Sequence, residues 1–446
     1  MTMDEIELAV RRAGTQRPEL SGALDVVADF LWPGEGVDQV HQAAVQCFLW
    51  WDVPKRHDPR DWGALVEATA VLLDAVGRDR LADIARSTET TSVLEAWGTD
   101  EAAGLAAFKS ARAVSGVEPP DTDVLAWGTV FGPYEAEALE EAERALGDAV
   151  AGGELVPGAP RAQATARRIT ERVLTTALDL PPGQTRVGLI TTERISHWIA
   201  LAPNEELSAW RSLVANRLLS PVGVEDPEAA VAPVRWLLEL CAAPEGALLS
   251  QSGYLPRGSV AEAAERFGWW DWPKPPRSEA DVHQLATIRE AARRLHLVRR
   301  RGRHLMATSR AKELLARPLE LWSIVATETE EGGDFALAVT EAVGLRLLQG
   351  RAEVHELAID VHPVLQAQGW SSGGRAISLV EVTSAIYIPV RWWSIFGILD
   401  EERMRWDSDA HRALNPHRYG LRPDGEAMVL AFLRARAVRP RHSVYD

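Results

Sequence analysis

The chain has 446 residues, of which 46% are apolar and 25% are charged, and its formal net charge is −16. These fractions are ordinary for globular proteins, so they exclude collagen-like, coiled-coil and wholly disordered chains. At about 150 residues per domain, the length predicts roughly three domains.

The two cysteines, Cys47 and Cys241, each lie in an apolar helical pattern, which is typical of small buried side chains. Two distant cysteines exclude a disulfide framework and a cysteine-based zinc cluster. The acidic N-terminus lacks the apolar segment of a secretory signal, and no apolar run reaches the roughly 18 residues of a membrane span. We therefore expect a cytoplasmic protein with no membrane partner and no cofactor.

Charge is distributed unevenly along the chain. Residues 1–227 carry a net charge of −16, residues 228–326 a net charge of +4, and residues 327–446 a net charge of −4. Because nucleic acids are polyanions, the first segment should repel them, whereas the middle segment need not. Nearly all basic residues are arginines, a preference typical of GC-rich genomes and therefore weak evidence for phosphate binding.

Residues 1–158 are predicted to form an acidic N-terminal helical domain. A run of helically spaced apolar residues should end at Asp52-Val53-Pro54, and the next helix should open at Asp58-Pro59. Thr88 should cap the helix after that. An acidic helix is expected over 133–150, where a regular apolar stripe indicates that the carboxylates lie on the wet face.

The segment 155–160 is rich in Pro and Gly and is typical of a linker, after which residues 161–227 are predicted to form a helical connector. Two stretches of about 100 residues then follow one pattern: helices, a short apolar edge, a polar hairpin, a strand and a closing helix. The matched pairs Gly268-Trp269 and Gly369-Trp370 support this internal repeat. It predicts two winged-helix-like modules, at 228–326 and 327–446, and a repeat this long indicates duplicated domains.

The predicted fold class is therefore mainly α, a multi-domain helical protein with two winged-helix-like modules in its C-terminal half, each an α unit with a small β-wing. The second module is the more divergent, because Pro389 lies inside its helical stretch and its hairpin, at 400–417, is longer. Its helical stretch is mostly apolar, which favours an internal or protein-facing surface.

The chain resembles a group of large uncharacterised proteins of actinomycete-type genomes that have an N-terminal helical domain and C-terminal winged-helix-like modules. The group has no assigned chemistry, so the resemblance implies an architecture and no activity. The stretches that carry it are Phe48–Lys55, Ile84–Thr88, Val93–Trp97, Ala126–Gly128 with Gly132, Gly153–Gly158, Ser252–Pro256, Leu295–Leu315 and Leu321–Trp322.

Common catalytic motifs are absent from the sequence: there is no phosphate-binding loop, dinucleotide-binding turn, nucleophile elbow or zinc-protease helix. His355 and His362 lie seven residues apart, on one helix face, but two imidazoles without a third ligand do not make a zinc site. Pro363 is expected to end that helix. We therefore expect no enzyme activity and no metal site.

The most specific positive feature is the arginine cluster in the hairpin 299–303, where Gly302 allows a tight turn. In a winged helix this hairpin is the wing, whose arginines can reach DNA phosphates or the minor groove. The preceding helix, 278–295, would be the recognition helix. The candidate nucleic-acid-binding residues are Gln284, Thr287, Arg293, Arg294, Arg299, Arg300, Arg301 and Arg303.

Two functions remain open at this point. The first is a regulator that binds DNA through the first module, although Glu279 and Asp281 are expected to be exposed in the first helical turn, where phosphates would repel them. The second is a protein-interaction scaffold or homodimer, in which both modules are structural and the acidic half docks a partner. The arginines of the hairpin distinguish the two functions. If these side chains are exposed, the DNA-binding function is favoured, and if they pair with acidic residues of the chain, the scaffold function is favoured.

Overall fold

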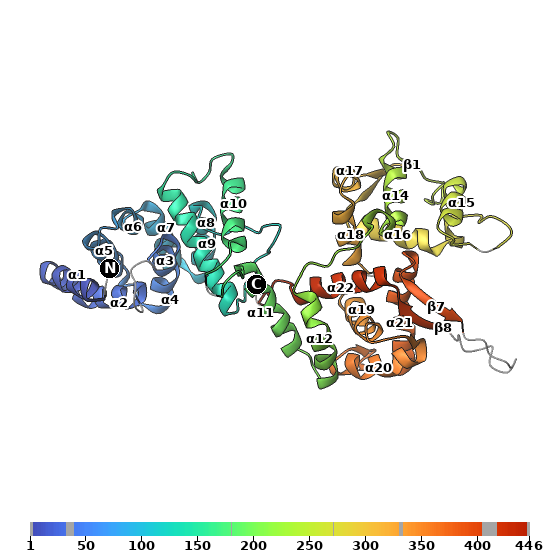
Figure 1. Cartoon of the computed structure of the whole chain (residues 1–446). Helices are drawn as coiled ribbons and strands as arrows, with labels where there is room; N and C mark the ends of the chain where they lie inside the picture. Colours follow the sequence, from blue (N-terminus) through green and yellow to red (C-terminus); the bar gives the residue numbers. More distant parts are fainter. Residues whose placement is uncertain are drawn as a thin grey trace. The chain divides into compact units, whose positions relative to one another are not determined.

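The structure is a computed structural model that describes residues 3–32, 40–179, 181–270, 272–329, 333–403 and 417–443 (Figure 1). These residues form a mainly helical protein with three small antiparallel sheets, as the sequence predicts. The chain divides into two compact units, Met1–Glu193 with Pro440–Asp446, and Arg194–Arg439. We call them the N-terminal unit and the C-terminal unit. No helix in the described part of the chain is both long and apolar enough to cross a membrane.

The N-terminal unit consists of helices packed around a core of buried apolar side chains, among them Leu24, Leu49 and Leu72. Its helices are α1 (Met3–Gln16), α2 (Ser21–Leu31), α3 (Gln42–Cys47), the π-helix Phe48–Asp52, α4 (Val53–Arg56), α5 (Trp62–Ala75), α6 (Asp79–Ala85), α7 (Thr88–Thr99), α8 (Glu101–Ser115), α9 (Pro133–Ala151), α10 (Ala162–Thr175) and the first part of α11 (Arg186–Ala200).

Three sequence predictions for this unit were wrong in detail. The run expected to end at Pro54 continues into α4, because a proline in the first helical turn needs no backbone N–H. Ser87, not Thr88, caps α7, since its side chain accepts a bond from the Thr90 N–H at 3.2 Å. The helix expected to open at Pro59 begins only at Trp62.

The segment around Arg441 belongs to the N-terminal unit. The Arg441 carbonyl accepts bonds from the N–H groups of Thr129 and Val130, at 2.7 and 3.1 Å, and the Ser443 N–H donates to the Thr129 hydroxyl at 2.9 Å. The Arg441 guanidinium lies 3.6 Å from the carboxylate of Glu135, which is fully buried. This segment therefore supplies the N-terminal unit with both backbone pairing and a buried charge.

The C-terminal unit contains an internal repeat, which follows α12 (Glu205–Leu218) and α13 (Pro227–Ala230). The first repeat has a three-stranded sheet of order β1-β3-β2, in which each neighbouring pair is antiparallel. Its elements are α14 (Ala232–Ala242), β1 (Ala247–Leu248), α15 (Arg257–Arg266), a 3-10 helix (Glu279–Asp281), α16 (His283–Arg294), β2 (Val298–Arg301), β3 (His304–Ala307), α17 (Ser309–Leu315) and α18 (Pro318–Ala326).

From its first helix to the helix after its hairpin, the second repeat follows the main helices and strands of the first, although its described residues include no counterpart of the 3-10 helix or of α18. Its sheet order, β4-β8-β7, matches that of the first. An additional hairpin, β5 with β6, precedes its third helix, and residues 404–416 of its long hairpin lie outside the described residues. The elements are α19 (Asp334–Leu347), β4 (Ala352–Glu353), α20 (Val354–Ala367), β5 (Ser371–Ser372), β6 (Arg375–Ala376), α21 (Leu379–Ile395), β7 (Leu399–Arg403), β8 (His417–Leu421) and α22 (Pro423–Ala437).

One continuous cluster of buried apolar residues runs through both repeats, so they pack as a single body. Two helix predictions were wrong here. The single helix expected over 278–295 is divided into a 3-10 turn and α16. The helix expected to end at Pro363 continues to Ala367, and this proline lies within it. The domain boundaries expected from the sequence, at 1–158, 161–227, 228–326 and 327–446, stay a prediction.

Candidate nucleic-acid interface

The arginine cluster lies on the hairpin between β2 and β3. Val298 pairs with Ala307 and Arg301 with His304, so the turn consists of Gly302 and Arg303. Gly302 has a φ of 62°, the left-handed conformation that favours glycine in a two-residue turn. Val298, Leu305 and Ala307 are buried, which anchors the hairpin to the core and leaves the arginines outside. The exposed arginines are Arg299, Arg300, Arg301 and Arg303.

None of these four arginines forms an ion pair with a carboxylate among the described residues of the C-terminal unit. The Arg300 Nε donates to the Gly302 carbonyl at 2.9 Å, and an Arg303 Nη donates to the Leu249 carbonyl at 3.0 Å. Both bonds orient a guanidinium without neutralising its charge. The hairpin therefore carries uncompensated positive charge, with Arg299 and Arg301 on one face of β2 and Arg300 on the other.

The two arginines at the end of α16 are placed differently. Arg293 is paired with Glu290 at 2.7 Å, and this bond lowers the pKa of the Glu290 carboxyl. Arg294 is half-buried, lies 3.3 Å from the Glu328 carboxylate and donates to the Thr329 carbonyl at 2.5 Å. Arg294 therefore serves to attach α16 to the segment after α18, and its charge is already compensated.

Gln284 and Thr287 are half-buried on α16, beside the apolar face formed by Leu285 and Ile288. The helix contacts α21 of the second repeat. Burial lowers the pKa of His283, the first residue of α16, and the positive charge of Arg391 on α21 lowers it further. The helix therefore packs against the second repeat, and Gln284 and Thr287, the residues expected to read bases, are only partly accessible.

Glu279 is fully buried, which corrects the expectation that it is exposed. Its carboxylate accepts a hydrogen bond from the Leu255 N–H at 2.8 Å and lies 3.1 Å from Nε of Arg289. Nη1 of the same arginine donates to the Gly253 carbonyl at 2.7 Å. Asp281 is exposed, and its carboxylate accepts the N–H groups of the two residues before the 3-10 helix. Glu279 therefore presents no negative charge to a phosphate at this surface.

Sequence reasoning missed Arg289, which joins α16 to the loop after β1 through Glu279 and Gly253. An acid spaced ten residues from an arginine is too common a pattern to indicate a buried pair. The His362 ring lies 3.0 Å from the Ile377 carbonyl, and His355 is exposed. Within the described ranges, no group of three or more His, Cys, Asp or Glu side chains is arranged to hold a metal ion.

Comparisons of the chain with models of protein families, with curated proteins and with solved structures found no match.

Proposed function

We propose that the chain is a non-enzymatic regulatory protein that binds DNA through the first repeat of the C-terminal unit. The observation that carries the proposal is the hairpin β2–β3, which presents Arg299, Arg300 and Arg301 to solvent without an acidic partner among the described residues of that unit. DNA binding depends strongly on such charges, because each phosphate contact releases condensed counterions.

We further propose that both repeats are winged helices. Supporting this, each has a helix, a short strand, two further helices and a final hairpin, and each sheet places the last strand in the middle. In that arrangement the third helix, α16, would be the recognition helix and the hairpin would be the wing. Since α16 contacts α21 and Arg294 is already paired, the proposal assigns binding chiefly to the wing and to phosphates rather than to bases.

The test is fluorescence anisotropy of a labelled DNA duplex with the full chain, at 50 and 200 mM salt. If three arginines each neutralise one phosphate, the logarithmic salt slope is about −2.7, so affinity should fall roughly 40-fold between the two salt concentrations. The variant in which Arg299, Arg300 and Arg301 are all alanine should bind weakly at both.

A matched control replaces three exposed arginines of the N-terminal unit, Arg12, Arg78 and Arg161, by alanine. It removes the same net charge and should retain the native affinity and salt slope. Equal loss of binding in both triple variants would show that total charge and not the hairpin is responsible. If the native chain binds no DNA at 50 mM salt, the proposal is wrong.

A second function, a protein-interaction scaffold or homodimer, is favoured by one observation. The helix α16, which a DNA reader needs free, contacts α21 within the same unit. In that case the hairpin arginines would pair with an acidic partner surface. Sedimentation of the native chain and of the hairpin variant distinguishes a homodimer: dimerisation that is lost in the variant would favour the scaffold over DNA binding.

A further inference from the structure

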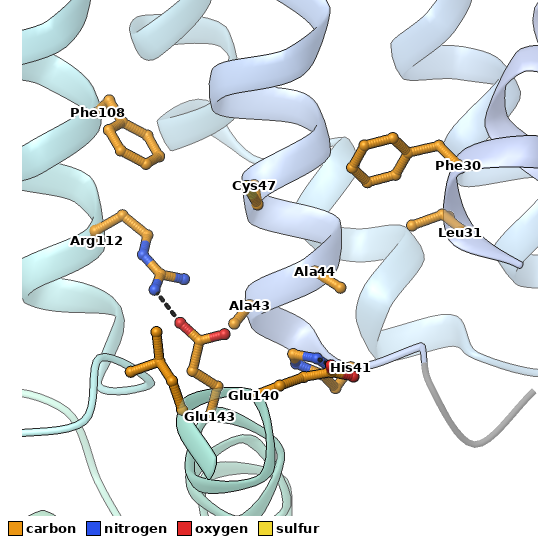
Figure 2. Close-up of a pocket in the computed structure, with 11 residues that line it drawn as sticks. Phe30, Leu31, His41, Ala43, Ala44, Cys47, Phe108, Arg112, Glu140 and Glu143 are labelled. Atoms are coloured by element: carbon orange, nitrogen blue, oxygen red, sulfur yellow. Dashed lines mark hydrogen bonds and ion pairs between the residues drawn. The ribbon is translucent and has the colours of Figure 1, made fainter. Parts of the chain in front are cut away.

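A pocket of about 450 Å³ lies within the N-terminal unit, among α2, α3, α8 and α9 (Figure 2). Its volume falls in the range of small-molecule sites. Apolar walls come from Phe30 and Leu31 at the end of α2 and from Phe108 on α8. Polar groups come from His41, Arg112, Glu140 and Glu143. Glu140 is itself paired with Arg144 at 3.1 Å. The pocket contains none of the residues proposed to bind DNA, so a ligand here does not compete directly for them.

The charges in the pocket are balanced. Arg112 and Glu143 form an ion pair at 2.5 Å, and both side chains are largely buried, with exposed fractions of 15% and 16%. Burial raises the pKa of the Glu143 carboxyl. A charged ligand would lose its hydration here without gaining an unpaired countercharge, which is unfavourable. The site therefore favours an uncharged molecule.

Two buried polar atoms at the pocket have no hydrogen-bond partner among the described residues: Nδ1 of His41 and one terminal nitrogen, Nη1, of Arg112. His41 is only 6% exposed, and buried polar groups are normally satisfied. Figure 2 shows the Arg112 guanidinium directed across the pocket toward α3, from which Cys47 also projects. These atoms are where a ligand could form hydrogen bonds.

The chemistry of the two atoms differs. Arg112 can only donate, so it requires an acceptor on the ligand. The pKa of His41 is lowered to about 4 by burial and by the charges of Arg144 and Arg112, so the ring is neutral near pH 7. Its Nε2 lies 4.0 Å from the Glu140 carboxylate, which favours the proton on Nε2 and leaves a lone pair on Nδ1. His41 Nδ1 therefore accepts, and requires a donor.

We propose that this pocket binds a small uncharged organic molecule with an apolar or aromatic body and an amide-like group that both accepts and donates hydrogen bonds. The body packs between Phe30, Leu31 and Phe108. The ligand carbonyl accepts from Arg112, and the ligand N–H donates to His41. Because Cys47 lines the same pocket, its thiol reports occupancy.

The test uses benzamide as the probe and the full chain as the protein. N-ethylmaleimide alkylation of Cys47 is followed by peptide mass spectrometry, and it should be slow because burial raises the pKa of this thiol to about 11. Cys241, which is fully buried, marks unfolding of the C-terminal unit. With a Kd of about 1 mM, ordinary for so small a ligand, a benzamide concentration of about 10 mM should slow Cys47 alkylation roughly tenfold. Benzoate and benzamidine, which have the same ring but carry charge, should leave the rate unchanged.

His41→Leu keeps the bulk of the side chain and removes the acceptor, so the Kd for benzamide should rise about fivefold. His57→Leu, a histidine outside the pocket lining, is the matched control and should bind as the native chain does. Ligand-observed NMR with the same variants measures binding without requiring Cys47 to react. The proposal is overturned if benzamide neither binds by NMR nor protects Cys47, if benzoate protects equally, or if His41→Leu binds with unchanged affinity.

Discussion

Glu341→Gln is expected to destabilise the C-terminal unit strongly, because Glu341 holds two arginines from distant parts of the chain. The carboxylate is 1% exposed. One oxygen accepts hydrogen bonds from Nε and Nη2 of Arg211 on α12, at 2.9 and 2.6 Å. The other oxygen accepts a hydrogen bond from Nε of Arg436 on α22, at 2.6 Å. Glu341 itself lies on α19, so this network joins three helices.

The loss of stability in Glu341→Gln comes mainly from Arg211, which loses its buried charged partner. Its side chain is 8% exposed, and its remaining contacts are the Trp198 carbonyl and the Trp198 ring, 4.6 Å from the guanidinium carbon. Arg436 is 27% exposed and can be hydrated instead. Breaking a buried ion pair on one side costs about 3–5 kcal/mol, and the glutamine oxygen still accepts a bond, so we expect about 3 kcal/mol.

Hydrogen–deuterium exchange suits this measurement, because it reports each helix separately in a protein with two units. A loss of about 3 kcal/mol should accelerate the slowest amides of α12, α19 and α22 roughly 150-fold, while the helices of the N-terminal unit serve as an internal reference. Glu320→Gln is the matched control. Its partner Arg317 lies at 3.1 Å with both side chains 54% exposed, so the effect should stay below about 1 kcal/mol.

The reasoning is refuted if Glu341→Gln accelerates exchange no more than Glu320→Gln does. A second variant separates charge from packing. Arg211→Met combined with Glu341→Leu leaves Arg436 as the one charge of the three, and it can reach water. This double variant should recover much of the lost stability, because apolar replacements of buried ion pairs are often tolerated.

Two further predictions concern single side chains. Glu279→Ala should lower the stability of the first repeat by about 3 kcal/mol, because the Leu255 N–H and Arg289 lose a fully buried partner. The control, Asp281→Ala, removes an exposed carboxylate at a helix start and should lower the stability by about 1 kcal/mol. Hydrogen–deuterium exchange of the α16 amides measures both losses of stability. Equal losses in the two variants would contradict the conclusion that Glu279 is a buried partner of Leu255 and Arg289. Protons bind unfolded His41, with its ordinary pKa near 6.5, but bind the folded form only near pH 4. Stability of the N-terminal unit should therefore be fully present above pH 6.5 and fall as the pH drops toward 4, by about 2 kcal/mol at about pH 5. Urea unfolding of native and His41→Leu chains at about pH 5 and about pH 7.5 tests this, since the variant should lack that part of the pH dependence.

The local features of the hairpin could be predicted from the sequence. Gly302 among arginines indicates a tight turn between two short strands. Helical periodicity likewise located α9 within one residue of its end. These features depend on neighbours in the chain, and local spacing is sufficient to predict them.

The electrostatic state of the site could not be predicted in the same way. Glu279 was expected in solvent, yet it is buried against Leu255, which is 24 residues earlier. Arg294 was predicted to be a DNA-binding residue, yet it is paired with Glu328, which is 34 residues later. Such pairs are set by how separate helices pack, and an acid on a helix face has the same local pattern whether or not an arginine arrives from elsewhere. The prediction that Pro363 ends its helix was also wrong, because this proline lies within α20.

The contribution of Arg441 to the N-terminal unit has a consequence for biosynthesis. The backbone partners of Thr129 and the guanidinium beside buried Glu135 come from this residue, which is translated after the whole C-terminal unit. At about 5–20 residues per second, a ribosome needs roughly 10–50 s to travel from Glu193 to Arg441. The first unit to emerge is therefore the last to be completed. A chain released before Arg441 lacks these contacts, so its N-terminal unit differs from that of a chain that includes Arg441.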